Sequence, residues 1–258
     1  MNFSGIVVTL NEEKNLKRCL DSLFKVCDEV VVVDSGSIDE TVEIANSYGA
    51  KVIFHEYLGD GKQKNFAIGH VKHDWIVQLD ADESIDDIAI EELNAFKASG
   101  LIEKYDALGF RRKTHIGKRW VKSCGWYPDP CVRVLNKKRA AFTDSVEHTR
   151  VIASKTMIFE GHILHYSFDS YSDLFDRTNR FTTRSARNLF LNERRVNGFS
   201  PFLHAFVRFF MKYFVKRGFL DGLDGLTVAI GQALGAYLKY AKLVEYQREG
   251  KAPENMWG

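Results

Sequence analysis

Two carboxylates, Asp80 and Asp82, directly follow the largely apolar run 75–79 of this 258-residue chain. The pattern predicts a buried parallel strand whose carboxyl end reaches solvent. Two residues apart on an extended strand, both side chains point to one side, and crowded carboxylates are costly unless a cation lies between them. Mg²⁺ or Mn²⁺ suits such oxygens and commonly completes its shell with substrate phosphates, which indicates a nucleotide diphosphate ligand. Alternatively, the acidic strand end only caps a helix that begins at 84–87.

The composition is that of an ordinary globular protein, with 45% hydrophobic and 27% charged residues. The formal net charge of +2 argues against a nucleic-acid-binding protein. Four cysteines without a Cys-x-x-Cys pair, and no secretory signal at the start, favour a reducing, cytoplasmic compartment. Neither a zinc site nor a disulfide framework is expected.

The elements that would hold these carboxylates alternate along the first third of the chain. Strands are predicted at 3–9, 29–33, 51–55 and 75–79, each an apolar or β-branched run. Capping boxes at Thr9 with Glu12 and at Ser37 with Glu40 predict that helices open there. The alternation predicts an α/β fold with a mostly parallel sheet and helices on both faces.

Polar clusters stand at the expected carboxyl ends of these strands, where parallel sheets bind ligands. Asp34 is placed to accept hydrogen bonds from a base or ribose, and Thr9 and Asn11 offer polar groups nearby. For Thr9, capping alone is an equally good reading. The Gly-x-Gly-x-x-Gly and Walker-type patterns are absent from the sequence, which disfavours nicotinamide-type and P-loop sites.

Four ordered motifs resemble glycosyltransferase family 2. They are Val-Val-Thr-Leu-Asn-Glu-Glu at 7–13, Val-Asp-Ser-Gly-Ser-Ile-Asp-Glu-Thr at 33–41, Gly-Lys-Gln-Lys-Asn-Phe-Ala at 61–67 and Leu-Asp-Ala-Asp-Glu at 79–83. More narrowly, Trp-Tyr-Pro-Asp at 126–129, Arg-Val-Leu at 133–135 and Gly-Phe-Leu-Asp-Gly at 218–222 resemble the lipopolysaccharide-core β-1,4-glucosyltransferases of the WaaE type.

The resemblance implies a GT-A fold, a nucleotide-sugar donor such as UDP-glucose, a divalent metal and inversion at the anomeric carbon. It places the metal carboxylate on Asp82. It places the nucleotide-sugar pocket on Thr9, Asn11, Glu12, Asp34, Lys64 and Asp80. The implied acceptor is the lipopolysaccharide core or another cell-envelope glycan, with a polyprenyl-linked or protein acceptor as alternatives. From another class, a non-catalytic nucleotide-sugar-binding scaffold would use the same fold.

Direct displacement needs a general base, and Asp129 is the predicted one because it lies between two prolines beside Trp126 and Tyr127. A turn aspartate in a Pro-Asp-Pro bend is the alternative. Glu147 and His148 are competing candidates, although the order Val-Glu-His departs from the usual Val-His-Glu of the family. His162 and His165 are expected to be structural.

We expect a transferase domain over 1–166 and a basic helical extension over 167–258. Within 202–217, Arg208, Lys212 and Lys216 form one helical stripe. Opposite them lie Phe202, Phe206, Phe209, Phe210 and Tyr213. This pattern predicts a helix at a membrane interface, and hence peripheral contact with the inner face of the cytoplasmic membrane. Docking on the catalytic domain is the alternative, and no uncharged run reaches the roughly 18 residues of a spanning helix.

Overall fold

The structure is a computed structural model that describes residues 1–144 and 149–253. It divides into two compact units, one of residues 1–113 and 128–166 and the other of residues 114–127 and 167–258. The stretch 114–127, which the expected division assigns to the first domain, therefore groups with the helical unit. The division into functional domains stays a prediction.

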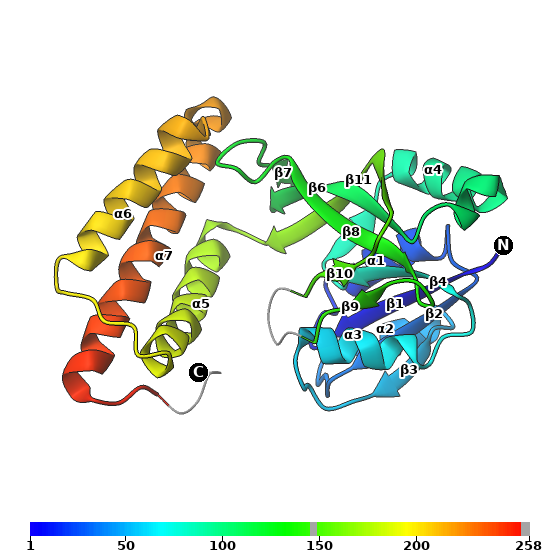
Figure 1. Ribbon diagram of the computed structural model, residues 1–258, viewed down its shortest axis with the longest axis horizontal. Coiled ribbons are helices and arrows are strands. Elements are labelled where there is room, and N and C mark those ends of the chain that lie inside the picture. The colour runs from blue at the N-terminus through cyan, green and yellow to red at the C-terminus, as the bar shows by residue number, and fades with distance from the viewer. Residues whose placement is uncertain (145–148, 254–258) are drawn as a thin grey trace. The chain divides into compact units, whose positions relative to one another are not determined.

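The first unit begins with alternating strands and helices and continues mainly as strands (Figure 1). Its elements are β1 (Phe3–Thr9), α1 (Leu16–Leu23), β2 (Glu29–Asp34), α2 (Thr41–Ser47), β3 (Lys51–Phe54), α3 (Asp60–Ile68), β4 (Trp75–Asp80), β5 (Glu83–Ile85), α4 (Asp87–Ala98), a 3₁₀ helix η1 (Gly100–Glu103), β6 (Ala107–Ile116), β8 (Asp129–Asn136), β9 (Ala141–Phe142), β10 (Val151–Ile152) and β11 (Thr156–Phe168). The last residues of β6 and β11 belong to the second unit.

Among the described residues, nine strands form one sheet in the order β3-β2-β1-β4-β8-β6-β11-β5, with β7 (Arg119–Trp120) paired to β6. The first four strands are parallel. From β4 onward the resolved pairings are antiparallel, starting with β4 against β8. The parallel half confirms the expected α/β class, and the antiparallel half brings side chains from distant parts of the chain to the same edge.

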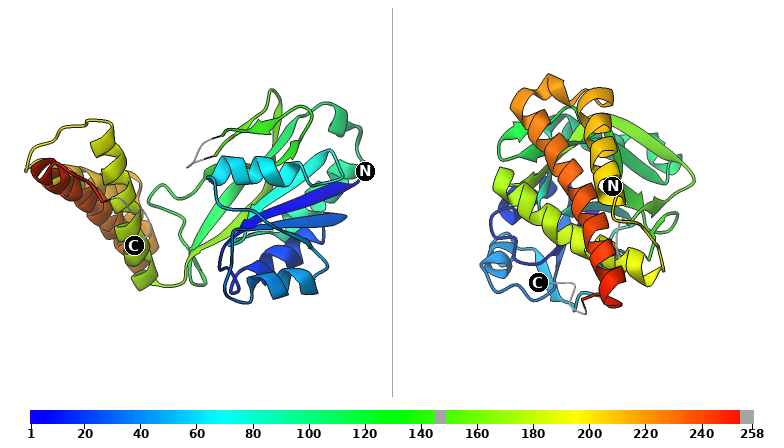
Figure 2. Two further views of the ribbon diagram at one scale, coloured as in Figure 1. Left: turned by 90° about the horizontal axis from the view of Figure 1, so that it is seen from below. Right: turned by 90° about the vertical axis from the view of Figure 1, so that its left-hand side faces the viewer.

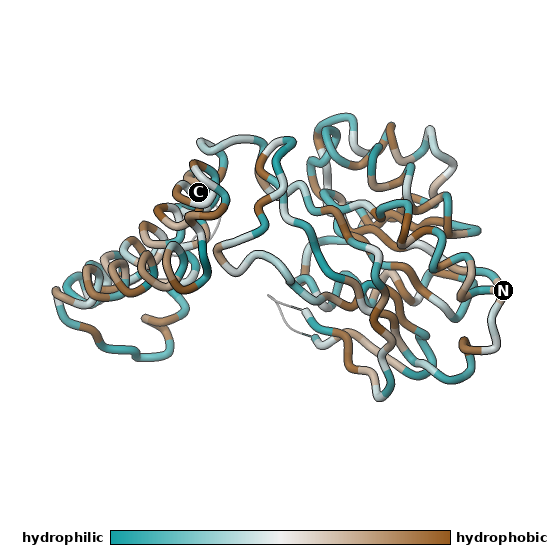
Figure 3. Tube along the Cα trace, turned by 90° about the horizontal axis from the view of Figure 1, so that it is seen from above, coloured by the Kyte–Doolittle hydropathy of each residue, from teal (hydrophilic) through white to brown (hydrophobic). Residues whose placement is uncertain are grey.

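Two apolar layers cover the two faces of this sheet. Successive residues of a strand point to opposite faces, so Val7 packs in one core with α1 and α4, whereas Ile6 packs in the other with α3. Figure 2 shows α3, in cyan, on one side of the sheet and the blue helices α1 and α2 on the other. Figure 3 shows hydrophobic and hydrophilic stretches alternating along the chain. The expected helices on both faces are confirmed.

The two predicted capping boxes are wrong. Helix α1 begins only at Leu16, because the six residues 10–15 that separate it from β1 form bends and turns instead of a first helical turn. The Ser37 hydroxyl bonds to Asp34 and accepts from the backbone of Asn11, so it does not cap α2. Both loops therefore project polar groups at the end of the sheet. Helix α4 is capped instead by Asp86, which accepts from Ala89 N at 3.0 Å.

The second unit is mainly helical, with α5, α6 and α7 drawn side by side in Figure 1. Its elements are α5 (Tyr171–Leu191), α6 (Ser200–Phe210), a π-helical turn η2 (Met211–Val215), a 3₁₀ helix η3 (Gly218–Asp221) and α7 (Gly222–Glu249). Its inner core includes Val121, Cys124, Leu174 and Val228. In the described part of the chain, no helix has the length and apolar character needed to cross a membrane.

Candidate active site

The polar ends of three neighbouring parallel strands lie at one edge of the sheet. In the register, Thr9 of β1 pairs with Asp34 of β2, and Val8 pairs with Asp80 of β4. The carboxyl ends of these strands therefore meet, as the strand–helix alternation predicts. The adjacent antiparallel strands also bring side chains to this edge, and the hydrophobic pattern of the sequence does not predict which ones.

Asp80 is balanced by two protein cations. Its Oδ1 lies 3.1 Å from Lys64 Nζ, and its Oδ2 lies 3.0 Å from Arg133 Nη2. Lys64 also pairs with Asp60, at 2.9 Å. Burial by itself would raise the pKa of Asp80, but the charges of Lys64 and Arg133 bring that pKa well below its usual range. Asp80 is therefore held as a carboxylate.

Glu83, which is fully buried, anchors the cationic side of the site. Arg133 binds it through two hydrogen bonds, from Nη2 to Oε1 at 2.5 Å and from Nε to Oε2 at 2.6 Å. This bidentate geometry fixes the guanidinium in a way that a lysine could not. Arg112 Nη1 also approaches Glu83 Oε1, at 3.5 Å. One buried carboxylate thus orients two arginines at the strand ends.

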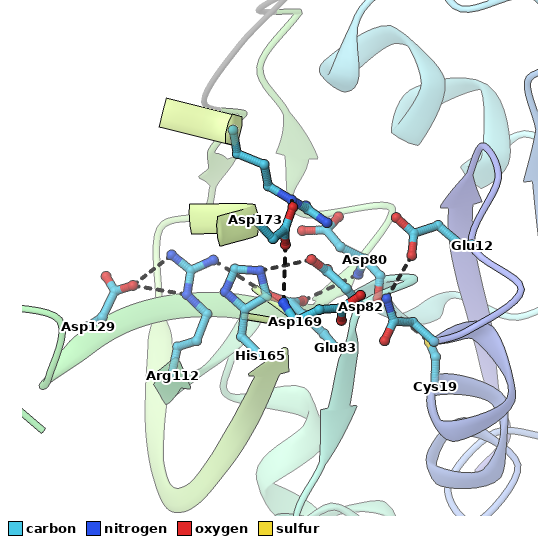
Figure 4. Close-up of polar contacts among 12 residues, drawn as sticks. Glu12, Cys19, Asp80, Asp82, Glu83, Arg112, Asp129, His165, Asp169 and Asp173 are labelled. Atoms are coloured by element: carbon cyan, nitrogen blue, oxygen red, sulfur yellow. Dashed lines mark hydrogen bonds and ion pairs between the residues drawn. The ribbon is translucent and has the colours of Figure 1, made fainter. Parts of the chain in front are cut away.

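Asp82 has a different partner from Asp80. Its Oδ2 lies 3.2 Å from Nε2 of His165, a residue of β11, and both side chains are about one-fifth exposed. Burial would lower the pKa of His165, but the hydrogen bond and charge of Asp82 raise it above its ordinary value. Figure 4 shows these two side chains directed toward each other. The two carboxylates are therefore separated by their partners and do not share one cation within the protein.

The Asp82–His165 pair offers one carboxylate oxygen and one imidazole nitrogen to a cation. Among residues 1–144 and 149–253, no group of three or more His, Cys, Asp or Glu side chains could hold a metal by themselves. Mg²⁺ and Mn²⁺ are commonly held by few protein ligands, with water and substrate phosphates completing the shell. The donor set fits a cation of that kind and does not form a complete protein cage.

Asp129 is the first residue of β8, and its Oδ2 accepts from Nη2 of Arg112 at 2.6 Å and from Nε at 2.9 Å (Figure 4). Arg112 therefore links Asp129 with Glu83. Asp129 also lines a cavity of about 680 Å³. The other polar residues of this lining are Asp60, Lys64, Asp80, Arg112, Cys131, Arg133, Thr149 and Arg150. The cavity thus brings together three of the predicted site residues: Lys64, Asp80 and Asp129.

The remaining predicted nucleotide residues lie in the loops after β1 and β2. Asn11 has a positive φ of 54°, and its Oδ1 accepts from Ile38 N at 2.9 Å. Asp34 Oδ2 accepts from the backbone of Gly36 at 2.8 Å and also bonds to Ser37 N. These contacts join the two loops into one polar rim.

Thr9 and Glu12 complete this rim. The Thr9 hydroxyl is buried, and no described residue forms a hydrogen bond with it. Glu12 Oε2 accepts from Asn15 Nδ2 at 2.9 Å, while the Glu12 backbone N–H donates to Thr41 at 2.8 Å. Asn11, Glu12 and Asp34 thus use at least part of their hydrogen-bonding capacity to shape the loops, and Thr9 does not.

The site residues that were not identified from the sequence include Glu83, Arg133 and His165. Arg133 and His165 reach the edge because β8 and β11 run antiparallel to their neighbours, and neither strand has a local signal for that placement. His165, expected to be structural, pairs with the predicted metal carboxylate. Glu147 and His148, the competing base candidates, lie outside the described residues.

In the second unit, the predicted cationic stripe lies on one side of α6 and η2. Arg208, Lys212 and Lys216 line a common groove. Of the predicted aromatic face, Phe202, Phe206 and Phe210 are exposed. Phe209 and Tyr213 instead pack against the inner core of the unit. The helix therefore uses part of its aromatic residues for packing and presents the others to solvent.

Comparison with the sequences of known proteins identifies the family of the chain. The model of glycosyl transferase family 2 matches residues 4–175. A glycosyltransferase of Rickettsia typhi is 33% identical over 94% of this chain and 86% of its own length. The lipopolysaccharide core biosynthesis glycosyltransferase LpsC of Rhizobium meliloti is 25% identical over 98% of this chain and 95% of its own length.

Among solved structures, residues 1–349 of S. aureus TarS in complex with UDP are 18% identical, with a TM-score of 0.48 over 97% of this chain and 92% of that chain. The family match covers more than half of the chain and includes the strand ends that carry Asp80, Asp82 and Glu83. The chain therefore belongs to glycosyl transferase family 2.

Proposed function

We propose that the protein is an inverting, metal-dependent hexosyltransferase that uses a nucleotide-diphosphate sugar, with UDP-glucose as the donor. The observation that carries the proposal is the Asp82–His165 pair next to the array of Lys64, Asp80 and Arg133. Side chains that can bind a metal, beside fixed cations, are the combination that a diphosphate leaving group needs. A bound divalent cation would neutralise the charge that develops on this leaving group.

The other roles in the reaction would belong to side chains of this protein. In a direct displacement, the acceptor oxygen bonds to the anomeric carbon, and the bond from that carbon to the diphosphate oxygen breaks, so its electrons leave with the diphosphate. Asp129 would take the proton of the acceptor hydroxyl. Arg112 holds Asp129 at 2.6 Å and would set the direction of its carboxylate. The polar rim of Thr9, Asn11, Glu12 and Asp34 would bind the nucleoside.

We propose a lipopolysaccharide-core or other cell-envelope glycan as the acceptor. The support is the similarity to LpsC along nearly the whole of both chains. A polyprenyl-linked or protein acceptor remains the alternative. Lipopolysaccharide of a deletion strain, compared by mass with that of its parent, should lack one hexose, whereas an unchanged mass would favour the alternative acceptors.

We also propose that the second unit contacts the inner face of the cytoplasmic membrane. Four phenylalanines and one leucine follow the helical repeat and form what we call the aromatic surface: Phe199, Leu203, Phe206, Phe210 and Phe214. Each of these side chains is at least 49% exposed. A continuous apolar stripe of this size on a helix bordered by cations is typical of interfacial binding. A lipid-linked acceptor would be presented there.

The enzymatic proposal is tested at Asp82. Asp82→Ala should lower UDP release from UDP-glucose with Mg²⁺ or Mn²⁺ by roughly a hundredfold or more, the scale for losing a group that stabilises leaving-group charge. Asp87→Ala is the matched control because Asp87 lies on the surface of α4, where its side chain is 91% exposed. Wild-type turnover in Asp82→Ala would indicate a catalyst that does not use this carboxylate, whereas absence of UDP release by the wild-type protein would favour a nucleotide-sugar-binding scaffold.

A further inference from the structure

A groove between α6 and α7 concentrates positive charge in the second unit. Its cavity has a volume of about 310 Å³. Four cations and one histidine line it together with apolar residues, and no Asp or Glu belongs to the lining. The lining consists of His204, Val207, Arg208, Met211, Lys212, Lys216, Ala236, Lys239 and Tyr240. We refer to it as the cationic groove.

The cations of this groove lack acidic partners, unlike other cations of the same unit. Arg119 pairs with Asp224 at 2.8 Å, and Arg177 pairs with Asp173 at 2.9 Å. Within the described ranges, no carboxylate lies within ion-pair distance of the four groove cations. Lys212 Nζ instead donates to the carbonyl oxygen of Cys124 at 2.9 Å. Lys239 Nζ lies over the Tyr240 ring, 4.6 Å from its centroid. The four positive charges therefore have no carboxylate counter-charge among the described residues.

Burial and neighbouring cations lower the pKa values of two groove residues, Lys212 and His204. Burial lowers the pKa of Lys212, and the nearby charges of Arg208 and Lys216 lower it further. The pKa of His204 is also lowered, by burial and then by Lys239 and other cations. Both shifts mean that a further positive charge is disfavoured inside the groove. A bound anion would relieve this repulsion.

The cationic groove and the aromatic surface share helix α6. Arg208 lies two residues from Phe206 and from Phe210, and Val207 and Met211 line the groove while remaining exposed. At 100° per residue, Phe206 and Phe210 each stand about 160° around the helix from Arg208. Val207 and Met211 stand only about 100° from Phe206 and Phe210, respectively, so the apolar surface continues around α6 to the rim of the groove, where headgroups beside the helix can reach it.

We propose that the cationic groove binds the phosphate of an anionic phospholipid headgroup, so that the second unit recognises acidic membranes and not lipid surfaces in general. This inference rests on the proposed membrane contact. Arg208 and Lys239 provide donors to the phosphate oxygens from two different helices, while Lys212 and Lys216 supply positive potential around them. The aromatic surface supplies affinity for any bilayer, and the groove supplies the preference for an anionic one.

The test measures binding of the full chain to sedimented vesicles of phosphatidylcholine, with and without phosphatidylglycerol. Arg208→Gln combined with Lys239→Gln should weaken binding to the anionic vesicles by at least about tenfold, because each cation near such a surface contributes several-fold in affinity. Binding to neutral vesicles should not change. Transfer of hexose to a soluble acceptor should also stay at the wild-type rate, which shows that the variant is folded.

A charge-matched control separates the groove from net charge. Arg180→Gln combined with Arg195→Gln removes the same two charges from exposed positions outside the groove lining. This control should retain most of the preference for anionic vesicles. Equal losses in the two double variants would overturn the inference, since they would indicate a diffuse electrostatic attraction.

Two further arms distinguish this inference from the membrane contact beneath it. Phe206→Ser combined with Phe210→Ser should weaken binding to both kinds of vesicle. If the wild-type protein bound neither kind of vesicle, both the membrane contact and the groove assignment would be overturned. Wild-type protein that binds both vesicles equally would overturn only the groove assignment. Free glycerol phosphate, at constant ionic strength, should compete only weakly. Full displacement at matched phosphate concentration would assign the groove to a soluble anion instead of a lipid.

Discussion

At the scale of single residues, the repulsion between Asp80 and Asp82 is reduced because each carboxylate has partners of its own. Asp80 lies between Lys64 and Arg133, and Asp82 pairs with His165. Position 133 needs an arginine, because its planar guanidinium group binds both oxygens of Glu83 and also reaches Asp80, which the ammonium group of a lysine could not do. The two carboxylates therefore have separate contacts, and in the proposed mechanism Asp80 fixes the cations while Asp82 binds the metal.

Asp129→Asn tests the proposed general base. The amide keeps the shape of the side chain but cannot take a proton, so kcat should fall by about a hundredfold or more. UDP binding should stay nearly unchanged, which a titration with UDP and Mn²⁺ would measure. Glu147→Gln, assayed in parallel, is the informative comparison, and a loss of kcat there with normal turnover in Asp129→Asn would transfer the role to Glu147.

At the scale of elements, close backbone packing holds the helical unit together at η3 and α7. A Cβ added at Gly225 would lie 1.8 Å from the carbonyl oxygen of Gly218. Cys124 Sγ donates to the carbonyl oxygen of Gly225 at 3.2 Å, and Asp221 accepts from the backbone of Ser123 at 2.7 Å. The Gly-Phe-Leu-Asp-Gly motif thus joins η3 and the start of α7 to the loop 121–127.

Gly225→Ala should therefore destabilise the protein. The added methyl group meets backbone atoms that cannot rotate away, and overpacking of this kind typically costs about 1–3 kcal/mol. Chemical denaturation would show the loss as a lower midpoint at an unchanged slope. Gly198→Ala is the matched control because a Cβ at Gly198 meets no atom within 4 Å. Equal midpoints for the two variants would contradict the packing argument.

At the scale of the whole molecule, a net charge of +2 conceals two different local charge arrangements. The edge of the sheet carries alternating carboxylates and cations that balance one another, whereas the cationic groove of the second unit has no carboxylate in its lining. Net charge governs solubility and long-range association, but binding depends on such local arrangements. The two proposed ligands, a nucleotide sugar for the first unit and lipid phosphate for the second, follow this difference in local charge.

Donor binding should stabilise the whole chain against heat. UDP with Mn²⁺ at about one hundred times its Kd should add about 2.7 kcal/mol to the free energy of unfolding, since only the folded protein binds it. For a chain of this size, that gain corresponds to a rise in Tm of several degrees. Calorimetry of Asp82→Ala should show a smaller rise with Mn²⁺ and UDP. An equal rise in Asp82→Ala would exclude Asp82 as a metal ligand.

The sequence by itself determined the parallel half of the fold and the residues at its strand ends. Runs such as 3–9 and 75–79 are local signals, because a strand buried on both faces must be apolar along its length. Asp34 directly follows the run 29–33, Asp80 directly follows the run 75–79, and Asp82 lies two residues further on. The polar edge of the sheet could therefore be predicted together with the strands. The four ordered motifs then indicated the family.

Only the tertiary structure decided which residues meet those strand ends. Arg133 is 53 residues from Asp80, and His165 reaches Asp82 from β11, through antiparallel pairings that hydrophobic periodicity does not encode. The capping patterns at Thr9 and Ser37 were misleading because the two loops hydrogen-bond to each other, which satisfies the groups that a helix end would otherwise use. Likewise, the helical wheel of α6 separated cations from aromatics, but packing against α7 decided that Phe209 and Tyr213 face inward and that four cations share one groove.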